Sequence, residues 1–106
     1  MTIKRRPHHH LAAVQAKFAT LEKLEVTRNA GEGARALGYS LKDIVEAVKA
    51  LKTGDFIKSE TAHSPPNSKV WHDTYNLPWS GRWLYLKFSG ETLIDITLTS
   101  FKEVGR

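Results

Sequence analysis

The stretch Arg82-Trp83-Leu84-Tyr85-Leu86-Lys87-Phe88 alternates between two kinds of side chain. From Leu84 onward every second residue is purely apolar: Leu84, Leu86 and Phe88. The residues between them carry a polar group: Trp83, Tyr85 and Lys87. Successive side chains of a β-strand point to opposite faces of its sheet. The alternation therefore predicts a strand with one face buried in a core and the other face left open.

Three further segments, residues 56–62, 69–76 and 92–102, are rich in aromatic and β-branched residues, which favour strands. Turn-forming residues stand between the four segments. Consecutive strands joined by short loops predict an antiparallel sheet. In 69–76 the alternation separates Val70, His72 and Thr74 from Trp71, Asp73 and Tyr75. The pattern alone leaves open which of these two sides is buried.

The last predicted strand contains a conflict of orientation. Ile94, Ile96 and Leu98 suit the core, but the same alternation would turn Lys102 inward and Phe101 outward. Burying a lysine in place of a phenylalanine is unfavourable. A β-bulge near Thr99-Ser100 reverses the alternation, because it adds one unpaired residue. We therefore expect a bulge there, with Phe101 buried and Lys102 exposed.

Apolar residues recur at helical spacing before the strands, in residues 10–22, 30–37 and 41–51. Residues 24–27 read as a short edge strand between the first two helices. A chain with helices first and consecutive strands after them is typical of an α+β domain. We expect one domain over 1–106, with the N-terminal helices packed on one face of a twisted antiparallel sheet.

Local signals mark the ends of two of these helices. Ser40 followed by Asp43 forms a capping box ahead of the third helix. Thr27 and Asn29 are both suited to cap the second helix, and Gly38 is suited to end it.

Composition narrows the functional classes. The 106 residues carry a formal charge of +5 and contain no cysteine, so disulfides and thiolate chemistry are excluded. No apolar run is long enough to cross a bilayer, and no signal segment is recognisable. We expect a cytoplasmic protein without a membrane partner. The positive charge favours a polyanionic partner, of which nucleic acid is the commonest.

The open sheet face would gather cations and rings. Tyr85, Lys87 and Lys102 share it, with Lys58 and His72 nearby. Lysines hold phosphates and aromatic rings stack on unpaired bases, so this face suits an RNA strand. No metal site or other cofactor is expected, because adjacent residues such as His8-His9-His10 splay apart and rarely hold one ion.

Five short motifs resemble those of a known family, in the same order and spacing. They are Lys4-Arg5-Arg6-Pro7-His8, Asp55-Phe56-Ile57-Lys58-Ser59, Val70-Trp71-His72-Asp73-Thr74-Tyr75, Leu84-Tyr85-Leu86-Lys87 and Ser100-Phe101-Lys102-Glu103. The family is that of the MqsR toxins, the motility and quorum-sensing regulators of bacterial toxin–antitoxin pairs. The resemblance covers nearly the whole chain.

The resemblance implies a RelE-like fold and a type II toxin that cleaves mRNA at GC-containing trinucleotides, which inhibits translation and growth. It implies a cognate MqsA-type antitoxin with a zinc-binding domain and a helix-turn-helix domain, through which alone operator DNA is reached. By motif position the family's catalytic residues fall on Lys58, Tyr85 and Lys102. His72 stands where the family has glutamine, and Ile57 stands where it often has tyrosine.

We expect an endoribonuclease without a metal, because RNA supplies its own nucleophile, the 2′-hydroxyl. In this hypothesis Lys58 and Lys102 stabilise the charge on the phosphate, and Tyr85 positions the phosphate or relays a proton. His72 acts as general acid or base. The expected contacts to flanking RNA come from Arg82, Lys87, Trp83, His8 and Arg5.

Two other functions remain open at this level. A basic sheet of this kind also suits a module that binds RNA without cutting it. A transcriptional role is the second alternative, but the 41–51 helix offers only Lys42 and Lys49 outward, which makes a poor recognition helix. We therefore expect any such role to depend on the antitoxin.

Overall fold

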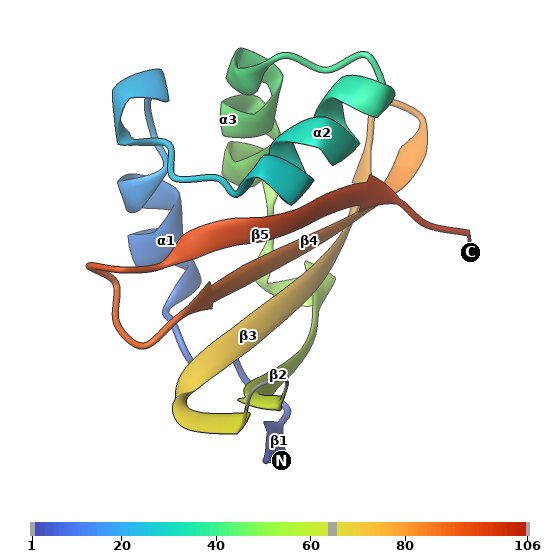
Figure 1. The fold of residues 1–106 in the computed structure, drawn as a ribbon. Helices are drawn as coiled ribbons and strands as arrows, with labels where there is room; N and C mark the ends of the chain where they lie inside the picture. Colours follow the sequence, from blue (N-terminus) through green and yellow to red (C-terminus); the bar gives the residue numbers. More distant parts are fainter. Residues whose placement is uncertain (1, 64–65, 106) are drawn as a thin grey trace.

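The computed structural model describes residues 2–63 and 66–105 as three α-helices and a five-stranded sheet. The helices are α1 (Leu11–Lys17), α2 (Arg28–Ala36) and α3 (Leu41–Ala50), with short 3₁₀ turns η1 (Leu21–Lys23) and η2 (Thr53–Asp55). The strands are β1 (Ile3–Lys4), β2 (Phe56–His63), β3 (Pro66–Trp79), β4 (Arg82–Gly90) and β5 (Thr97–Glu103). They lie in the order β1-β2-β3-β4-β5, and every neighbouring pair is antiparallel. The three helices cover one face of this twisted sheet, so the α+β prediction is confirmed (Figure 1).

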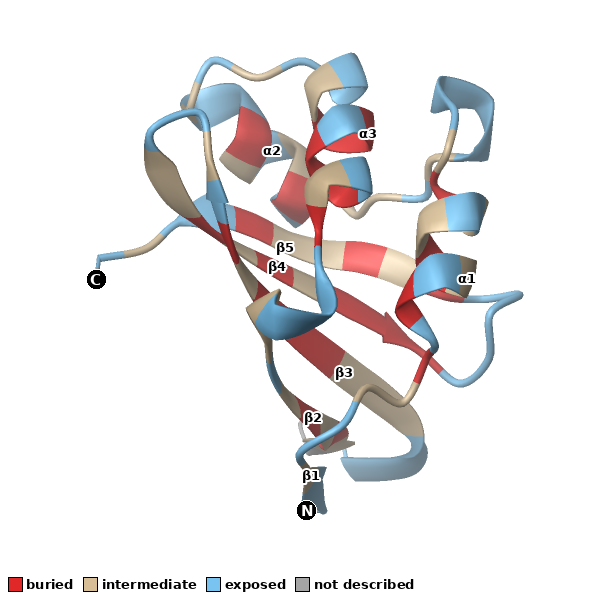
Figure 2. Ribbon diagram, turned by 180° about the vertical axis from the view of Figure 1, so that it is seen from behind, coloured by how far each residue is buried: buried red, intermediate tan, exposed pale blue. Residues whose placement is uncertain are grey.

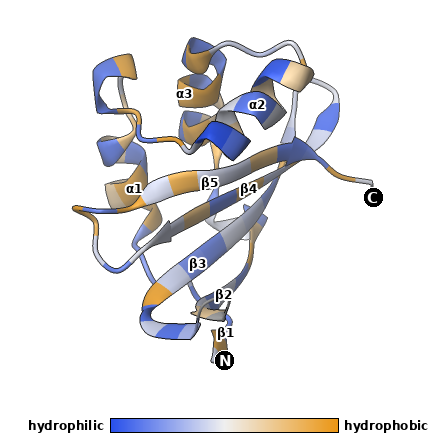
Figure 3. Ribbon diagram, viewed as in Figure 1, coloured by the Kyte–Doolittle hydropathy of each residue, from blue (hydrophilic) through white to orange (hydrophobic). Residues whose placement is uncertain are grey.

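The core lies between the helices and the sheet. Leu84, Leu86 and Phe88 are completely buried there, as the alternation in β4 predicted. Phe18 of the segment after α1 packs on Phe88, with ring centroids 5.5 Å apart. Figure 2 shows the buried residues of α1, α2 and α3 turned toward the sheet, and Figure 3 shows hydrophobic and less hydrophobic residues alternating along β5.

The local helix signals are confirmed. Ser40 and Asp43 form the reciprocal capping box of α3. The Thr27 side chain accepts a hydrogen bond from the Ala30 N–H at 3.2 Å, so Thr27 caps α2. Gly38 has a φ of 85°, in the left-handed region that glycine adopts at helix ends.

Two predictions for the N-terminal half are wrong in extent. The first helix ends at Lys17 instead of residue 22, and a 3₁₀ turn follows it. Residues 24–27 do not form an edge strand; Val26 makes a single parallel bridge with Leu98 of β5. This segment therefore lies beside β5 and bonds its backbone around Leu98.

The predicted bulge is present. Lys87 pairs with Ser100, but the next residue, Phe88, pairs with Leu98, so Thr99 is the extra residue. Phe101 is buried and Lys102 is exposed as a result. Ile94, by contrast, was expected in the core and is 90% exposed, because β5 begins only at Thr97.

The β3–β4 hairpin is tighter than the sequence predicted. Residues 76–79 belong to β3, and the connection is reduced to Ser80 and Gly81, whose φ values of 54° and 74° are those of a two-residue turn of type I′. The other predicted loop, 63–68, includes residues 64–65, which lie outside the described residues. Among the described residues, no helix is both long and apolar enough to cross a membrane.

Candidate active site

The sheet face opposite the helices carries three rows of polar side chains. Residues that pair directly across antiparallel strands point to the same face. Pairing gives the first row as Glu60, His72, Ser89 and Thr97. The second row is Lys58, Thr74, Lys87 and Ser100. The third row is Asn76, Tyr85 and Lys102. We call this surface the open face.

The open face brings together the four catalytic candidates, Lys58, His72, Tyr85 and Lys102. His72 lies in the first row and Tyr85 in the third, on either side of the row of Lys58. Four residues separate these rows along β3, which is roughly 13 Å at the usual rise of a strand. The candidates are therefore neighbours on one surface and not scattered over the molecule.

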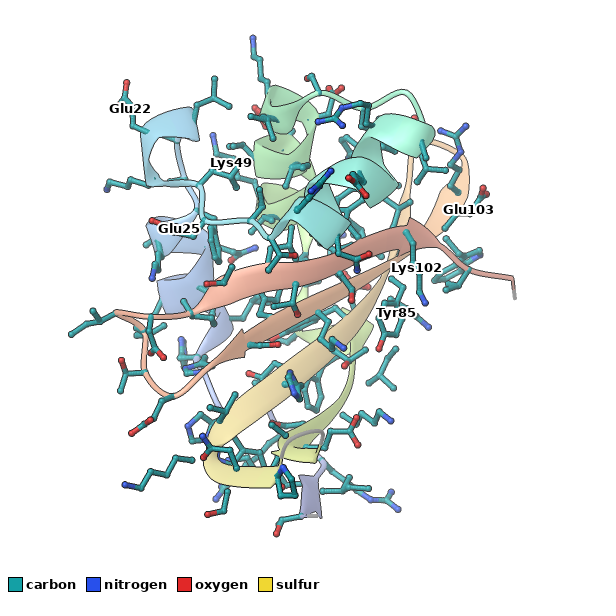
Figure 4. The ribbon with its side chains drawn as sticks, viewed as in Figure 1. Glu22, Glu25, Lys49, Tyr85, Lys102 and Glu103 are labelled. Atoms are coloured by element: carbon teal, nitrogen blue, oxygen red, sulfur yellow. The ribbon has the colours of Figure 1, made fainter. Side chains whose placement is uncertain are left out.

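Lys102 and Tyr85 form the best-defined contact of the third row. The Lys102 amine lies 5.1 Å from the centroid of the Tyr85 ring, on the directly opposed strand. Figure 4 shows both side chains extending in the same direction from neighbouring strands. A cation over an aromatic ring is an attractive arrangement. This contact holds a positive charge beside a phenol.

Lys58 is restrained by a carboxylate on its own strand. Its amine lies 3.4 Å from Glu60 Oε1, and the Glu60 side chain is only 16% exposed. The Lys58 side chain is 43% exposed, so its amine is accessible from the open face. Lys87 lies in the same row two strands away, roughly 10 Å between Cα atoms.

His72 is hydrogen-bonded to a chain of two hydroxyl groups on the neighbouring strands. Its Nδ1 atom makes a hydrogen bond with Ser89 Oγ, which in turn lies 2.8 Å from Thr99 Oγ1. Thr99 Oγ1 donates to the Lys87 carbonyl at 3.2 Å. The bulge residue Thr99 thus connects the imidazole to the backbone of β4.

Of the five residues expected to contact flanking RNA, the structure places two on the open face, Lys87 and Trp83. Trp83 pairs with Pro78 and follows the row of Tyr85. Arg82 points the other way, toward the helices. Its guanidinium donates to the Tyr39 hydroxyl at 2.9 Å and to the Leu37 carbonyl at 3.4 Å. The hydrogen bond to Tyr39 raises the pKa of Arg82.

The N-terminal arm, residues 2–10, also lies away from the open face. His8 stacks on Trp71 with ring centroids 5.0 Å apart, and the Lys4 amine is 3.0 Å from His8 Nδ1. Burial, and then the Lys4 charge, lower the pKa of His8. Arg5 is exposed on this arm. The structure does not bring His8 or Arg5 to the catalytic candidates.

Asp73 anchors this arm on the helix side of the sheet. Its buried carboxylate accepts from the N–H groups of His8 and His9, at 3.1 and 2.9 Å, and from Ser59 Oγ at 2.5 Å. His9 is buried, and its Nε2 atom makes a hydrogen bond with the Gly90 carbonyl at 3.1 Å. The acidic residue beside His72 therefore has a structural task.

Sequence reasoning assigned no role to Thr74 and Asn76. Thr74 Oγ1 and Asn76 Oδ1 are buried on the open face, with no hydrogen-bond partner among the described residues. Thr74 lies between Lys58 and Lys87, and Asn76 lies beside Tyr85. The alternation that starts at Val70 and His72 contained this signal, because it places Thr74 and Asn76 on the same face as His72.

Two comparisons with known proteins bear on this site. The family model described as motility quorum-sensing regulator, toxin of MqsA, matches residues 6–103 of the chain. No curated protein matches it. The matched residues include all four strands that build the open face, β2 to β5.

Proposed function

The chain belongs to the family of motility quorum-sensing regulator toxins, and from this membership we propose that it is a metal-independent endoribonuclease that cuts mRNA. As a toxin of a toxin–antitoxin system, it has an MqsA-type antitoxin as partner. We further propose that it acts in the cytoplasm, prefers GC-containing sites, and inhibits translation and growth. Operator DNA is reached through the antitoxin alone.

One observation carries this proposal: a possible base and a possible acid flank a pair of cations. His72 and Tyr85 lie on opposite sides of the row that contains Lys58 and Lys87. In a phosphoryl transfer the attacking and leaving oxygens are in line on opposite sides of phosphorus. A phosphate over the central row would thus have one proton-transfer group near each apical oxygen.

The reaction uses the substrate's own hydroxyl. His72 removes the 2′-hydroxyl proton, O2′ bonds to phosphorus, and the bond from phosphorus to the 5′-oxygen breaks. Tyr85 gives a proton to that leaving oxygen. The products are a 2′,3′-cyclic phosphate and a 5′-hydroxyl, and water later restores the two protonation states.

Fixed positive charges stabilise the phosphorane-like transition state. Lys58 and Lys87 face the phosphate from opposite strands, and Lys102 adds its charge beside Tyr85. Groups already in place before the reaction contribute strongly, because no reorganisation is needed as charge develops. Trp83 supplies a ring on which a neighbouring base can stack.

The test is cleavage of a defined RNA by the purified chain in the presence of EDTA, with both new ends mapped. We expect cyclic phosphate and 5′-hydroxyl ends, and a loss of rate of at least 100-fold in Lys58→Ala and in Tyr85→Phe. Lys42→Ala, a change of an exposed lysine on α3, is the matched control. Binding of RNA without new ends, or wild-type rates in both variants, would overturn the proposal.

A further inference from the structure

Two hydroxyl groups, Ser89 Oγ and Thr99 Oγ1, form a chain of hydrogen bonds from His72 to the Lys87 carbonyl. The number of protons in this hydroxyl chain decides which group donates in each bond. Thr99 Oγ1 has one proton and donates it to the Lys87 carbonyl, which can only accept. Thr99 must therefore accept the hydrogen bond that joins it to Ser89. The Ser89 proton is used in that bond, and Ser89 Oγ has only lone pairs left for the imidazole. His72 Nδ1 must then be the donor.

From this proton count we infer that Ser89 and Thr99 are positioning residues that hold neutral His72 in the Nδ1–H tautomer. The lone pair of the ring is then on Nε2. A histidine acts as a base only through its unprotonated nitrogen, and the bond made by the other nitrogen sets which one that is. Resting on the proposed function, the inference assigns the removal of the 2′-hydroxyl proton to Nε2.

The fold explains why this chain of groups exists. Thr99 is the residue added by the β5 bulge, so its side chain reaches Ser89 instead of pairing in the ladder. Ser89 pairs with both His72 and Thr97, which places its hydroxyl between β3 and β5. The bulge that buries Phe101 thus also supplies the hydroxyl that orients the imidazole.

The inference bears on how His72 can act as a base, because an imidazole exchanges protons near neutral pH. An imidazole with mixed tautomers would present a protonated Nε2 part of the time. The hydroxyl chain removes that ambiguity.

The tautomer is measured directly by ¹⁵N NMR of the full-length protein at a pH where the imidazole is neutral. The His72 signals are identified by their absence in His72→Gln. We expect a protonated Nδ1 and an unprotonated Nε2 in the wild type. In Thr99→Val the Ser89 proton becomes available to Nδ1, so the tautomer should shift toward Nε2–H. Thr99→Ser keeps the hydroxyl and should restore the wild-type spectrum.

Kinetics give the second measurement. Ser89→Ala and Thr99→Val should lower kcat for RNA cleavage about tenfold or more, with little change in KM, because the phosphate-binding lysines are intact. Thr97→Val is the matched control: it is the same change on the same strand, and the Thr97 hydroxyl bonds the Asp95 carbonyl outside the chain of groups. Thr97→Val should keep both tautomer and kcat.

The outcomes separate this inference from the proposed function. A wild-type His72 protonated on Nε2, or an unchanged tautomer in Thr99→Val, overturns the inference whether or not RNA is cut. A correct tautomer with an unchanged kcat in both Ser89→Ala and Thr99→Val overturns the positioning role. Failure of the wild type to cleave RNA overturns the proposed function, and the NMR result alone then decides the tautomer.

Discussion

The Lys102 amine lies 5.1 Å above the ring of Tyr85, and the two residues are direct partners on β5 and β4. Lys102 would not face this way without Thr99, because the bulge reverses the alternation of β5 before Lys102. One unpaired residue in the ladder thus sets the charge beside the phenol.

Removing the Lys102 charge while keeping the length of its side chain should impair catalysis. Lys102→Met is expected to lower kcat/KM for RNA cleavage by about 100-fold, since it removes one pre-positioned positive group. Lys42→Met, on the exposed side of α3, serves as the control and should cleave normally. Single-turnover cleavage of a short RNA measures both. Equal rates in the two variants would show that the contact in the third row is only structural.

Asp73→Asn should destabilise the fold by roughly 2–4 kcal/mol, because a buried carboxylate that accepts three hydrogen bonds becomes an amide with a single oxygen. The amide would also turn donors toward the His8 and His9 N–H groups. Urea unfolding followed by circular dichroism measures the change. The control is Asp55→Asn, where the carboxylate accepts one exposed bond from the Lys52 N–H that an amide oxygen can still accept, so the expected cost is about 1 kcal/mol or less. Similar costs at both positions would contradict the anchoring role of Asp73.

Two glycines of α2 should respond in opposite ways to the same substitution. A Cβ at Gly33 would lie 2.0 Å from the Phe101 carbonyl oxygen, so Gly33→Ala must push α2 off β5. We expect a loss of about 1–3 kcal/mol in the free energy of unfolding. Gly31 has nothing within 4 Å of that position, and Gly31→Ala should raise stability by about 0.5–1 kcal/mol through helix propensity. Thermal unfolding of both variants measures the two changes in stability. A stabilised Gly33→Ala would contradict the close contact between Gly33 and the Phe101 carbonyl.

The buried Tyr75 phenol should make the stability of the fold depend on pH in the alkaline range. Burial, followed by the Asp73 charge, raises the pKa of the Tyr75 phenol well above its usual value. The folded state therefore holds this proton more tightly than the unfolded chain, whose tyrosines titrate near a pKa of about 10. The resulting stabilisation is complete below pH ~10 and is lost as the pH rises through the folded pKa.

Tyr75→Phe should accordingly lose less stability than the wild type between pH 9 and pH 11. At pH 7 the variant should be as stable or slightly more stable, because the Tyr75 hydroxyl is buried with no hydrogen-bond partner among the described residues. Urea unfolding at pH 7, 9, 10 and 11 measures the difference. Parallel pH profiles for the two proteins would contradict the shifted pKa.

Much of the fold could be predicted because its signals are local. The alternation in residues 82–88 predicted which side of β4 is buried, and Ser40 with Asp43 predicted the start of α3. The conflict between Phe101 and Lys102 was enough to predict the bulge. Arg82 shares its parity with Leu84, so its placement on the helix side could also have been inferred from the sequence.

Other features depend on contacts between distant segments. Ile94 looks like a core residue in the sequence, but β5 starts after it and leaves it exposed. His9 is buried because Asp73, far away in the chain, binds its backbone N–H. No pattern within the N-terminal arm contains that information.

The sequence by itself determined the α+β class, the two faces of β4 and the residues that resemble a toxin family's active site, because alternation and capping act over a few residues. Only the tertiary structure decided the register between the strands. That register pairs His72 with Ser89, and it places Lys87 on the strand between those of Lys58 and Lys102. Register follows from the Ser80-Gly81 turn and the Thr99 bulge acting together with the packed core. A strand's alternation fixes which way each side chain points, but pairing across strands fixes which side chains meet.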